Sequence, residues 1–323
     1  MTKNEATIVN FSQYMPILRA ETVGIHHLLS FFKKTDMDYD KNGNIFINFK
    51  KETDGTPILV AHLDNVLSGE REPVLDVTGK RMFGRTNGIG FDDKAGIIAI
   101  VELWRRIKDR NFRIIFTADE EIGGVGAHAI DPSVYNDAAY IIELDRRGSC
   151  DLIQTSGCTR LCSDEFASMF SKYGFKKATG TFTDVNVFKL GAPSVNMVNL
   201  SIGYYEAHTN KEYLEINDFQ HIVDCVQDFI ETHRECIPDN TPPEPKRHYN
   251  FDDRYGRFDN PRYGNHLLDD YDFLDEPLEI CDWCTSTVDP KNRVENQYGV
   301  FCCEECCKAA EACFYSNEED DEI

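Results

Sequence analysis

The stretch FRIIFTADEE, residues 112–121, begins as an apolar run and ends in three consecutive acidic side chains. Short apolar runs with polar ends are typical of strands that are buried on both faces of a sheet. Two other segments, PILVAHLD at 57–64 and AAYIIELD at 138–145, have the same organisation. Because ligands bind at the carboxyl ends of the strands in such sheets, we expect the polar residues of these three ends to lie close together.

Helical patterns lie between and after these strands. Further segments with clear patterns are a pair of helices within 5–33, strands at 44–49 and 194–201, and helices at 94–108, 163–173 and 217–231. Strands and helices therefore alternate along the chain. This alternation predicts an α/β protein with three layers, α/β/α, in which helices cover both faces of a mixed, mostly parallel central sheet.

Composition divides the 323-residue chain into four parts. The periodic segments all fall within residues 1–236, which we expect to form the catalytic domain. Residues 237–280 are rich in Pro, Asp, Arg and Tyr, with almost no aliphatic periodicity, so we expect an acidic linker without stable structure. Residues 281–314 form a small cysteine-rich module, and residues 315–323 form an acidic tail.

The formal net charge of −22 is concentrated at the C-terminal end. From Asp239 onward there are 22 acidic and 8 basic side chains, a balance of −14, which leaves −8 for the first 238 residues. This excess of acidic groups disfavours nucleic-acid binding, which depends on Lys and Arg. The N-terminal segment lacks a signal-peptide pattern, and no stretch approaches the ~18 apolar residues that span a bilayer, so we expect a cytoplasmic protein.

Side chains that bind divalent metals occur at the strand ends and in two further motifs. The candidate ligands are His62, Glu121 and Asp145 at the strand ends, Asp92 in GFDDKAG (90–96) and His208 in EAHTNKEYL (206–214). Two nitrogen and three carboxylate ligands suit two zinc ions that share one carboxylate. Each residue alone also has a structural explanation, such as a helix N-cap or an acidic first helical turn, so the prediction depends on their convergence.

Two carboxylates beside these ligands are candidate catalytic residues. Glu120, next to Glu121, can remain free to take a proton from water. Asp64 lies two residues after His62, on the same face of a strand, and can orient the imidazole through its second ring nitrogen. The glycines that flank Asp92 allow a sharp turn that presents both oxygens of its carboxylate.

Together, and in this order, these motifs make residues 1–235 resemble the co-catalytic di-zinc exopeptidases. This superfamily includes peptidase T, carboxypeptidase G and the bacterial leucyl aminopeptidases. GFDDKAG and FTADEEIG are most similar to peptidase T. The later segment, residues 183–219, resembles aminopeptidases without a lid domain, in which TD is followed by G-x-P and then by H-[TS]-x-x-E.

The resemblance implies a role for each candidate residue. The implied zinc ligands are His62 and Asp145 for one ion, Glu121 and His208 for the other, and Asp92 as the bridge between them. Glu120 is implied to be the general base and later the general acid, acting on a water molecule shared by the zinc pair, and Asp64 to orient His62. The peptide bond between Asp92 and Asp93 is implied to be cis.

The chain departs from peptidase T in the length of one segment. Only 62 residues separate Asp145 from His208, too few for the lid or dimerisation domain that peptidase T and carboxypeptidase G insert there. We therefore expect a single compact catalytic domain without a lid, closer in build to a leucyl-type aminopeptidase. Without that domain, neither substrate preference nor dimerisation carries over from the resemblance.

Seven of the 12 cysteines lie in the C-terminal module. Without a secretion signal, clustered cysteines indicate a metal site rather than disulfides. FCCEECCKAAEA at 301–312 resembles the FCSEEC signature of treble-clef zinc fingers. On that match the ligands of one structural zinc ion are Cys281, Cys284, Cys302 and Cys306, with Cys303 and Cys307 as an alternative pair. We expect the module to be structural or to contact a protein partner.

The sequence thus predicts a zinc-dependent hydrolase that cleaves small peptides, an aminopeptidase with two catalytic zinc ions and one structural ion. Two alternatives remain open at this point. One is a related deacylase or amidohydrolase that uses the same metals on a non-peptide amide. The other is an inactive, metal-bound scaffold whose finger recruits a protein partner, although a scaffold has no need of a proton-transferring Glu120.

Overall fold

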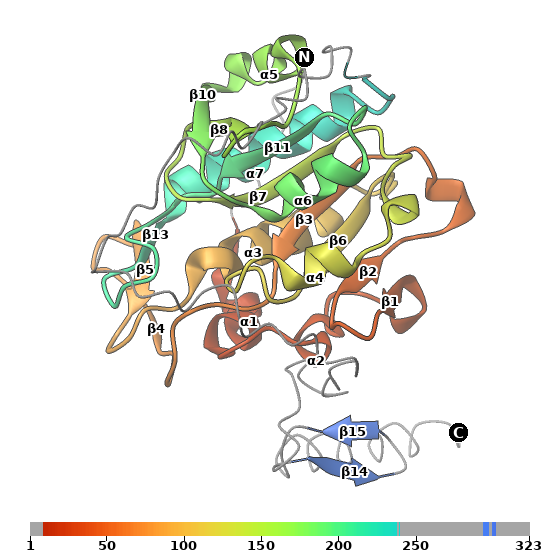
Figure 1. Ribbon diagram of the computed structural model, residues 1–323. Helices are drawn as coiled ribbons and strands as arrows, with labels where there is room; N and C mark the ends of the chain where they lie inside the picture. The colour runs from red at the N-terminus through yellow and green to blue at the C-terminus, as the bar shows by residue number, and fades with distance from the viewer. Residues whose placement is uncertain (1–8, 238, 240–292, 297–298, 302–323) are drawn as a thin grey trace, which may run out of the picture.

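The computed structural model describes residues 9–237, 239, 293–296 and 299–301. Its main sheet follows the strand order β1-β2-β6-β3-β7-β11-β8-β10, with β9 paired to β8 (Figure 1). These strands are β1 (Met37–Tyr39), β2 (Ile45–Ile47), β3 (Ile58–His62), β6 (Arg113–Thr117), β7 (Ile141–Arg146), β8 (Asp151–Ser156), β9 (Thr159–Arg160), β10 (Lys176–Gly180) and β11 (Met197–Ser201).

The centre of the sheet is parallel. Strands β6, β3, β7 and β11 are parallel neighbours. Strands β1 and β2 pair antiparallel with their neighbours, and β8 pairs antiparallel with β11 but parallel with β10. His62 at the end of β3 pairs in register with Thr117 at the end of β6. The carboxyl ends of the central strands therefore meet at one edge of the sheet, as expected for a site built on several strands.

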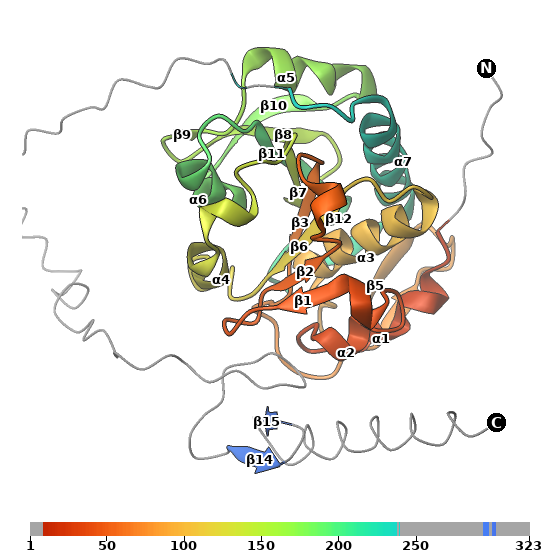
Figure 2. The ribbon, with the colours of Figure 1, turned by 90° about the vertical axis from the view of Figure 1, so that its right-hand side faces the viewer.

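Helices cover both faces of the sheet, as Figure 2 shows. Helices α1 (Met15–Arg19), α3 (Phe91–Arg106) and α7 (Ile216–Thr232) pack on one face, and α4 (Val125–Ala129) and α6 (Asp184–Gly191) lie on the other. Along β3, Leu59 and Ala61 belong to the first core, whereas Ile58 and Val60 belong to the second. The sequence therefore reads as continuously apolar because both sides of the strand are buried. The predicted α/β class, with a mixed central sheet, is confirmed.

The predicted strands and the long helices are present, with small shifts of their ends. The segment 163–173 is divided into α5 (Asp164–Met169) and the 3-10 helix η5 (Ser171–Tyr173), and the N-terminal pair is η1 (Phe11–Tyr14) with α1, followed by α2 (Ile25–Leu28). Further short 3-10 turns are η2 (Lys34–Asp36), η3 (Lys51–Thr53) and η4 (Pro132–Val134). Strands β8 and β10 and helix α6 were not predicted. The sequence of β10, KKATG, gives the reason, since it lacks the apolar alternation that identifies a strand.

A second, smaller sheet also went unpredicted. It has the order β12-β13-β5-β4, formed by β12 (Tyr204–Tyr205), β13 (Tyr213–Glu215), β5 (Arg81–Gly84) and β4 (Pro73–Leu75). Pairing of β13 with β5 places the segment around His208 next to the start of α3. This sheet thus connects two motifs that lie more than a hundred residues apart in the chain.

The C-terminal predictions fall almost entirely outside the described residues. Only the antiparallel pair β14 (Val294–Asn296) and β15 (Gly299–Phe301) is described there. The linker after Asp239, the acidic tail and the predicted finger ligands Cys281, Cys284, Cys302 and Cys306 lie outside it. Among the described residues, no helix combines the length and apolar character needed to cross a bilayer.

Candidate metal centre

The carboxylate of Asp92 lies between two histidines that come from opposite ends of the catalytic region. Its Oδ1 is 3.1 Å from Nε2 of His62, at the end of β3, and its Oδ2 is 3.0 Å from Nε2 of His208. The two oxygens of one carboxylate thus each contact a different imidazole. This is the arrangement that a carboxylate shared by two cations requires.

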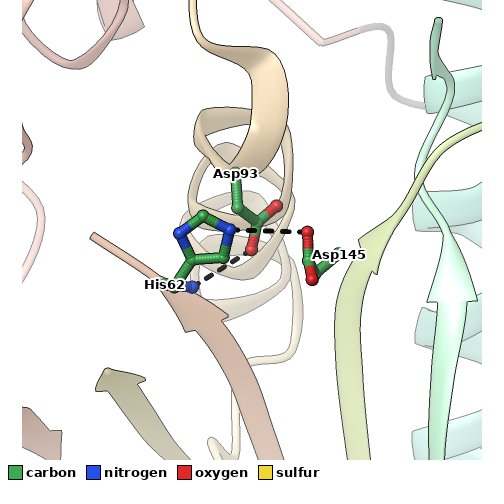
Figure 3. A group of neighbouring side chains, drawn as sticks. All are labelled: His62, Asp93 and Asp145. Atoms are coloured by element: carbon green, nitrogen blue, oxygen red, sulfur yellow. Dashed lines mark hydrogen bonds and ion pairs between the residues drawn. The ribbon is translucent and has the colours of Figure 1, made fainter. Parts of the chain in front are cut away.

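Each histidine has a further carboxylate beside it. Asp145, at the end of β7, places Oδ1 3.5 Å from His62 Nε2 (Figure 3). Glu121 places Oε1 3.1 Å from His208 Nε2. The structure therefore brings all five predicted ligands together in two groups that share Asp92.

The distances within these groups suit a tetrahedral cation. Zinc–nitrogen and zinc–oxygen bonds of about 2.0–2.2 Å in tetrahedral geometry separate neighbouring ligand atoms by about 3.3–3.6 Å. The separations found here, 3.0–3.5 Å, are close to that range. In addition, Glu121 Oε1 is buried and accepts no hydrogen bond. The donor atoms and their spacing fit a pair of divalent metal ions.

Ionisation in the centre reflects crowded carboxylates around two imidazoles. Contact with Asp92 raises the pKa of His208 to about 9, even though partial burial opposes its charged form. Burial raises the pKa of Glu121 to about 7, and the nearby charge of Asp92 adds to this shift. Burial alone would also raise the pKa of Asp92, yet contacts with His208 and His62 lower it. A site with this excess of negative charge favours bound cations.

Asp93 was not predicted as a site residue, but it lies against the same histidine. Potential ligand atoms of His62, Asp93 and Asp145 lie within 4.8 Å of one another, and Figure 3 shows these side chains. However, Asp93 Oδ2 accepts a hydrogen bond from the backbone N–H of His62 at 3.1 Å, and Oδ1 accepts one from Gly96 at 2.9 Å. Because both its oxygens are already engaged, Asp93 holds the histidine backbone in place rather than competing with Asp92.

The backbone around Asp92 adopts unusual conformations. The peptide bond between Asp92 and Asp93 is cis, as the resemblance implied. Gly90 has φ +75°, a left-handed conformation that glycine adopts without strain. A Cβ atom on Gly96 would lie 2.2 Å from the carbonyl oxygen of Leu144, so only glycine allows α3 to approach β7 this closely.

Asp64 has a wider role than the sequence indicated. Strand β3 ends at His62, so Asp64 lies beyond the strand rather than on it. His62 Nδ1 is 3.0 Å from the backbone oxygen of Asp64 and 3.5 Å from its Oδ1. The same carboxylate accepts the backbone N–H groups of Glu120 at 3.0 Å and Glu121 at 3.1 Å. Asp64 therefore fixes both the imidazole and the turn that carries the two glutamates.

Glu120 differs from its neighbour in having a free carboxylate. Within the described part of the chain, this carboxylate has no hydrogen-bond or ion-pair partner. Burial raises its pKa, and the charges of Asp92 and Asp64 act in the same direction. A carboxylate whose pKa is raised above its ordinary value, and which forms no hydrogen bond or ion pair with the protein, can accept and return a proton.

Glu212 was missed as a site residue, although it is the last letter of the H-[TS]-x-x-E pattern. Its buried carboxylate accepts backbone N–H groups from Gly90 at 2.7 Å, Phe91 at 2.8 Å and Asp92 at 3.2 Å. Burial raises the pKa of Glu212 to about 6. This side chain caps the start of α3 and thereby fixes the backbone of Asp92.

Replacing Glu212 by Ala is expected to destabilise the protein by about 3 kcal/mol or more. The substitution leaves three backbone N–H groups without an acceptor, and each buried unsatisfied donor costs about 1–3 kcal/mol. Urea unfolding measures this loss, and Glu212→Gln, which retains an acceptor oxygen, is the conservative control. Equal unfolding midpoints for Glu212→Ala and the wild type would contradict this role.

Two residues with no signal in the sequence hold Asp145. The hydroxyl of Tyr204 donates to the backbone oxygen of Asp145 at 3.1 Å and lies 3.4 Å from its Oδ1. Asn199 Oδ1 accepts the backbone N–H of Asp145 at 3.1 Å. Their roles appear only in the folded protein, where β11 pairs with β7 and the Tyr204 hydroxyl reaches Asp145 from β12 in the smaller sheet.

Parts of this chain are similar in sequence to known peptidases. Residues 74–152 match the family model of M42 glutamyl aminopeptidases. Peptidase T from Staphylococcus saprophyticus is 36% identical over 100 residues, which are 28% of this chain and 24% of that protein. The chain matches at most 30% of the length of the curated relatives found. The M42 match includes Asp92, Glu120, Glu121 and Asp145.

Two solved peptidase structures share the fold. Aminopeptidase PepT from Bacillus cereus aligns with a TM-score of 0.55 and 16% identity, over 68% of this chain and 96% of that chain. A tripeptidase from Staphylococcus aureus aligns with a TM-score of 0.56 and 13% identity, over 70% of this chain and 99% of that chain. At these identities the likeness concerns the fold alone. With the local sequence matches, it supports a relationship to the metallo-exopeptidases.

Proposed function

We propose that this chain is a zinc-dependent hydrolase that removes the N-terminal residue from small peptides. The observation that carries this proposal is the position of Asp92, whose two oxygens contact His62 and His208 on opposite sides. Together with Glu121 and Asp145, it would hold two zinc ions. The local matches to M42 and peptidase T sequences support peptide cleavage as the reaction.

The protein's own contribution to the reaction is proton transfer and orientation. Bound as proposed, the zinc ions would polarise the scissile carbonyl group and lower the pKa of a water molecule. Glu120 takes the proton of the attacking water and delivers it to the departing amine. Asp64 keeps Glu120 and His62 in fixed relative positions, because it hydrogen-bonds to both segments.

A screen combined with metal analysis tests this function directly. Purified protein is analysed for zinc and then assayed on aminoacyl, acyl and carboxy-terminal model amides of matched leaving groups. We expect hydrolysis only where a free amino group precedes the scissile bond. Preference for N-acyl substrates would favour the deacylase, and absence of turnover by zinc-loaded protein would favour the inactive scaffold.

The catalytic region is proposed to work as a single domain without a lid. Between Asp145 and His208, strands β8, β10 and β11 all join the main sheet. The segment that could otherwise extend away as a separate domain is thus part of the fold that carries the site. No partner subunit is needed to assemble the five ligands described above.

The C-terminal module is proposed to bind a third, structural zinc ion. Replacing Cys281 and Cys284 by Ser is expected to lower bound zinc from about three to about two ions per chain, because a structural site needs four ligands. The matched control replaces Cys158 and Cys236, which are exposed and free. Metal content measured by mass spectrometry decides the outcome, and unchanged zinc in the Cys281/Cys284 variant would rule out these ligands.

The proposed partners follow from the same features. Small peptides are the proposed substrates, and the C-terminal module is the proposed contact for a protein partner. The acidic C-terminal segment remains unfavourable for nucleic acids. We propose that the protein acts in the cytoplasm.

A further inference from the structure

Exposed apolar side chains lie beside the turn that carries Glu120 and Glu121. Ile122 follows Glu121 directly and is 71% exposed, and Val125 at the start of α4 is 41% exposed. Phe182, in the loop between β10 and α6, is 42% exposed. Because these side chains are exposed, they do not contribute the free energy of apolar burial to the core.

Gly124 is the common neighbour of these residues, because Ile122 and Val125 lie within two residues of it in the chain and Phe182 packs on it. The ring of Phe182 packs over this glycine so closely that its Cζ would lie 2.8 Å from a Cβ placed there. The N–H groups of Gly123 and Gly124 both donate to the carbonyl oxygen of Glu120 at 2.9 Å, so Ile122 lies at the outer bend of the turn. Two residues along the chain span at most about 7.6 Å between Cα atoms, so Ile122 also lies close to Gly124. We call Ile122, Val125 and Phe182 the apolar wall.

The loop that carries Phe182 is fixed to the same strand as Asp145. Glu143 on β7 accepts hydrogen bonds from the hydroxyl of Thr183 and from the backbone N–H of Asp184, the latter at 3.2 Å. Glu143 precedes Asp145 by two residues and is fully buried. The apolar wall therefore has a defined position relative to the metal centre, which favours selective binding.

The two chain segments that carry the apolar wall are acidic. The segments 119–125 and 181–185 contain four acidic side chains and no basic one. An acidic substrate side chain placed here would meet like charges and find no basic side chain of these segments to pair with. A neutral apolar side chain avoids this repulsion and gains from burial against the wall.

We propose that the apolar wall is the subsite for the side chain of the substrate's N-terminal residue, and that this residue is apolar. The inference rests on the proposed aminopeptidase function and gives its substrate class. It separates this chain from a glutamyl specificity, the one in the name of the matching family model. Ile122 follows Glu120, the proposed general base, by two residues, so a side chain bound at this subsite would adjoin the scissile bond.

The test compares p-nitroanilides of Leu, Ala, Glu and Lys on the zinc-loaded full-length protein. We expect kcat/KM for the Leu substrate to exceed that for the Glu substrate by at least about 100-fold, and that for the Ala substrate by about tenfold, in line with pocket discrimination by burial and charge. Equal or higher kcat/KM for Glu or Lys would overturn the apolar subsite. Such a result would leave the aminopeptidase function standing.

Variants of the wall locate the subsite. Phe182→Ala and Ile122→Ser are each expected to lower the ratio of Leu to Ala kcat/KM by about tenfold. Leu190→Ser, on the same loop-helix unit and 71% exposed, is the matched control and should keep the wild-type ratio. Equilibrium binding of leucine and glycine hydroxamates gives a second readout. The ratio of the leucine to the glycine hydroxamate affinity should also fall by about tenfold in each wall variant. An unchanged ratio in both wall variants would overturn the location, whereas absence of any anilide hydrolysis by the wild type would overturn the function itself.

Discussion

Replacement of Glu120 by Gln is expected to lower kcat by about 10²–10⁴-fold while bound zinc stays at the wild-type level. The amide has the same shape as the carboxylate but cannot accept a proton from water. Its carboxylate has no hydrogen-bond or ion-pair partner among the described residues, so the exchange breaks no such interaction. Steady-state kinetics and metal analysis on the same preparation measure the two effects separately.

The control for this variant is Glu165→Gln, the same chemical change at an exposed position in the first turn of α5. It should leave both kcat and zinc content unchanged. If the Glu120 variant hydrolysed peptides as fast as the wild type, the general-base role would be wrong. A loss of zinc together with activity would instead place Glu120 among the ligands.

Replacement of Asp92 by Asn is expected to remove one or both catalytic zinc ions and to lower activity by more than about 100-fold. An amide keeps one oxygen, but its nitrogen cannot bind a cation, so Asn contacts only one of the two positions that Asp92 now serves. Loss of a residue that merely supports a ligand already costs about 10–100-fold in metal affinity, so loss of the shared ligand should cost more. Calorimetric titration of the metal-free variant and the metal-free wild type with zinc measures the number of bound ions and their affinities.

Asp38→Asn, at an exposed position on β1, is the matched control and should bind as many ions as the wild type. Asp93 offers a sharper contrast, because it lies beside Asp92 but hydrogen-bonds to the backbone of His62 and Gly96. If Asp92→Asn retained both ions with unchanged affinity, Asp93 would be the better candidate for the bridge. The two aspartates are adjacent in sequence, so only measured stoichiometry separates them.

The sequence predicted the fold class and the polar ends of three central strands, but not every strand of the sheet. Its three apolar runs ended in His62, Glu120–Glu121 and Asp145, and parallel pairing of β3, β6 and β7 brought these ends to one edge. The pattern worked because strands buried on both faces must be apolar, so a polar residue marks where the strand leaves the core. By contrast, β10 has a polar sequence and lies at the end of the strand path, and the pattern gave no sign of it.

Residues that position the site were harder to predict than residues that form it. Glu212 acts through the backbone of three residues at the start of α3, and Tyr204 acts through the backbone and carboxylate of Asp145. Every residue except proline has a backbone N–H and every residue has a carbonyl group, so a hydrogen bond to the backbone leaves no pattern in the sequence. Neither role could therefore be predicted from the sequence. The apolar wall was invisible for a similar reason, since Phe182 lies 58 residues after Gly124 in the chain and packs on it only in the folded protein.

The sequence alone determined which candidate metal ligands are present and in which order they follow the strands. It did so because buried strands must be apolar, so the end of an apolar run marks the end of a strand. The tertiary structure alone decided which carboxylate oxygen contacts which imidazole nitrogen in the candidate metal centre. That decision depends on a small second sheet and on a buried glutamate that holds a helix start, both of which act across more than a hundred residues. It also depends on glycines that allow close contact between elements. Pairwise distances of this kind follow from packing, which no local pattern encodes.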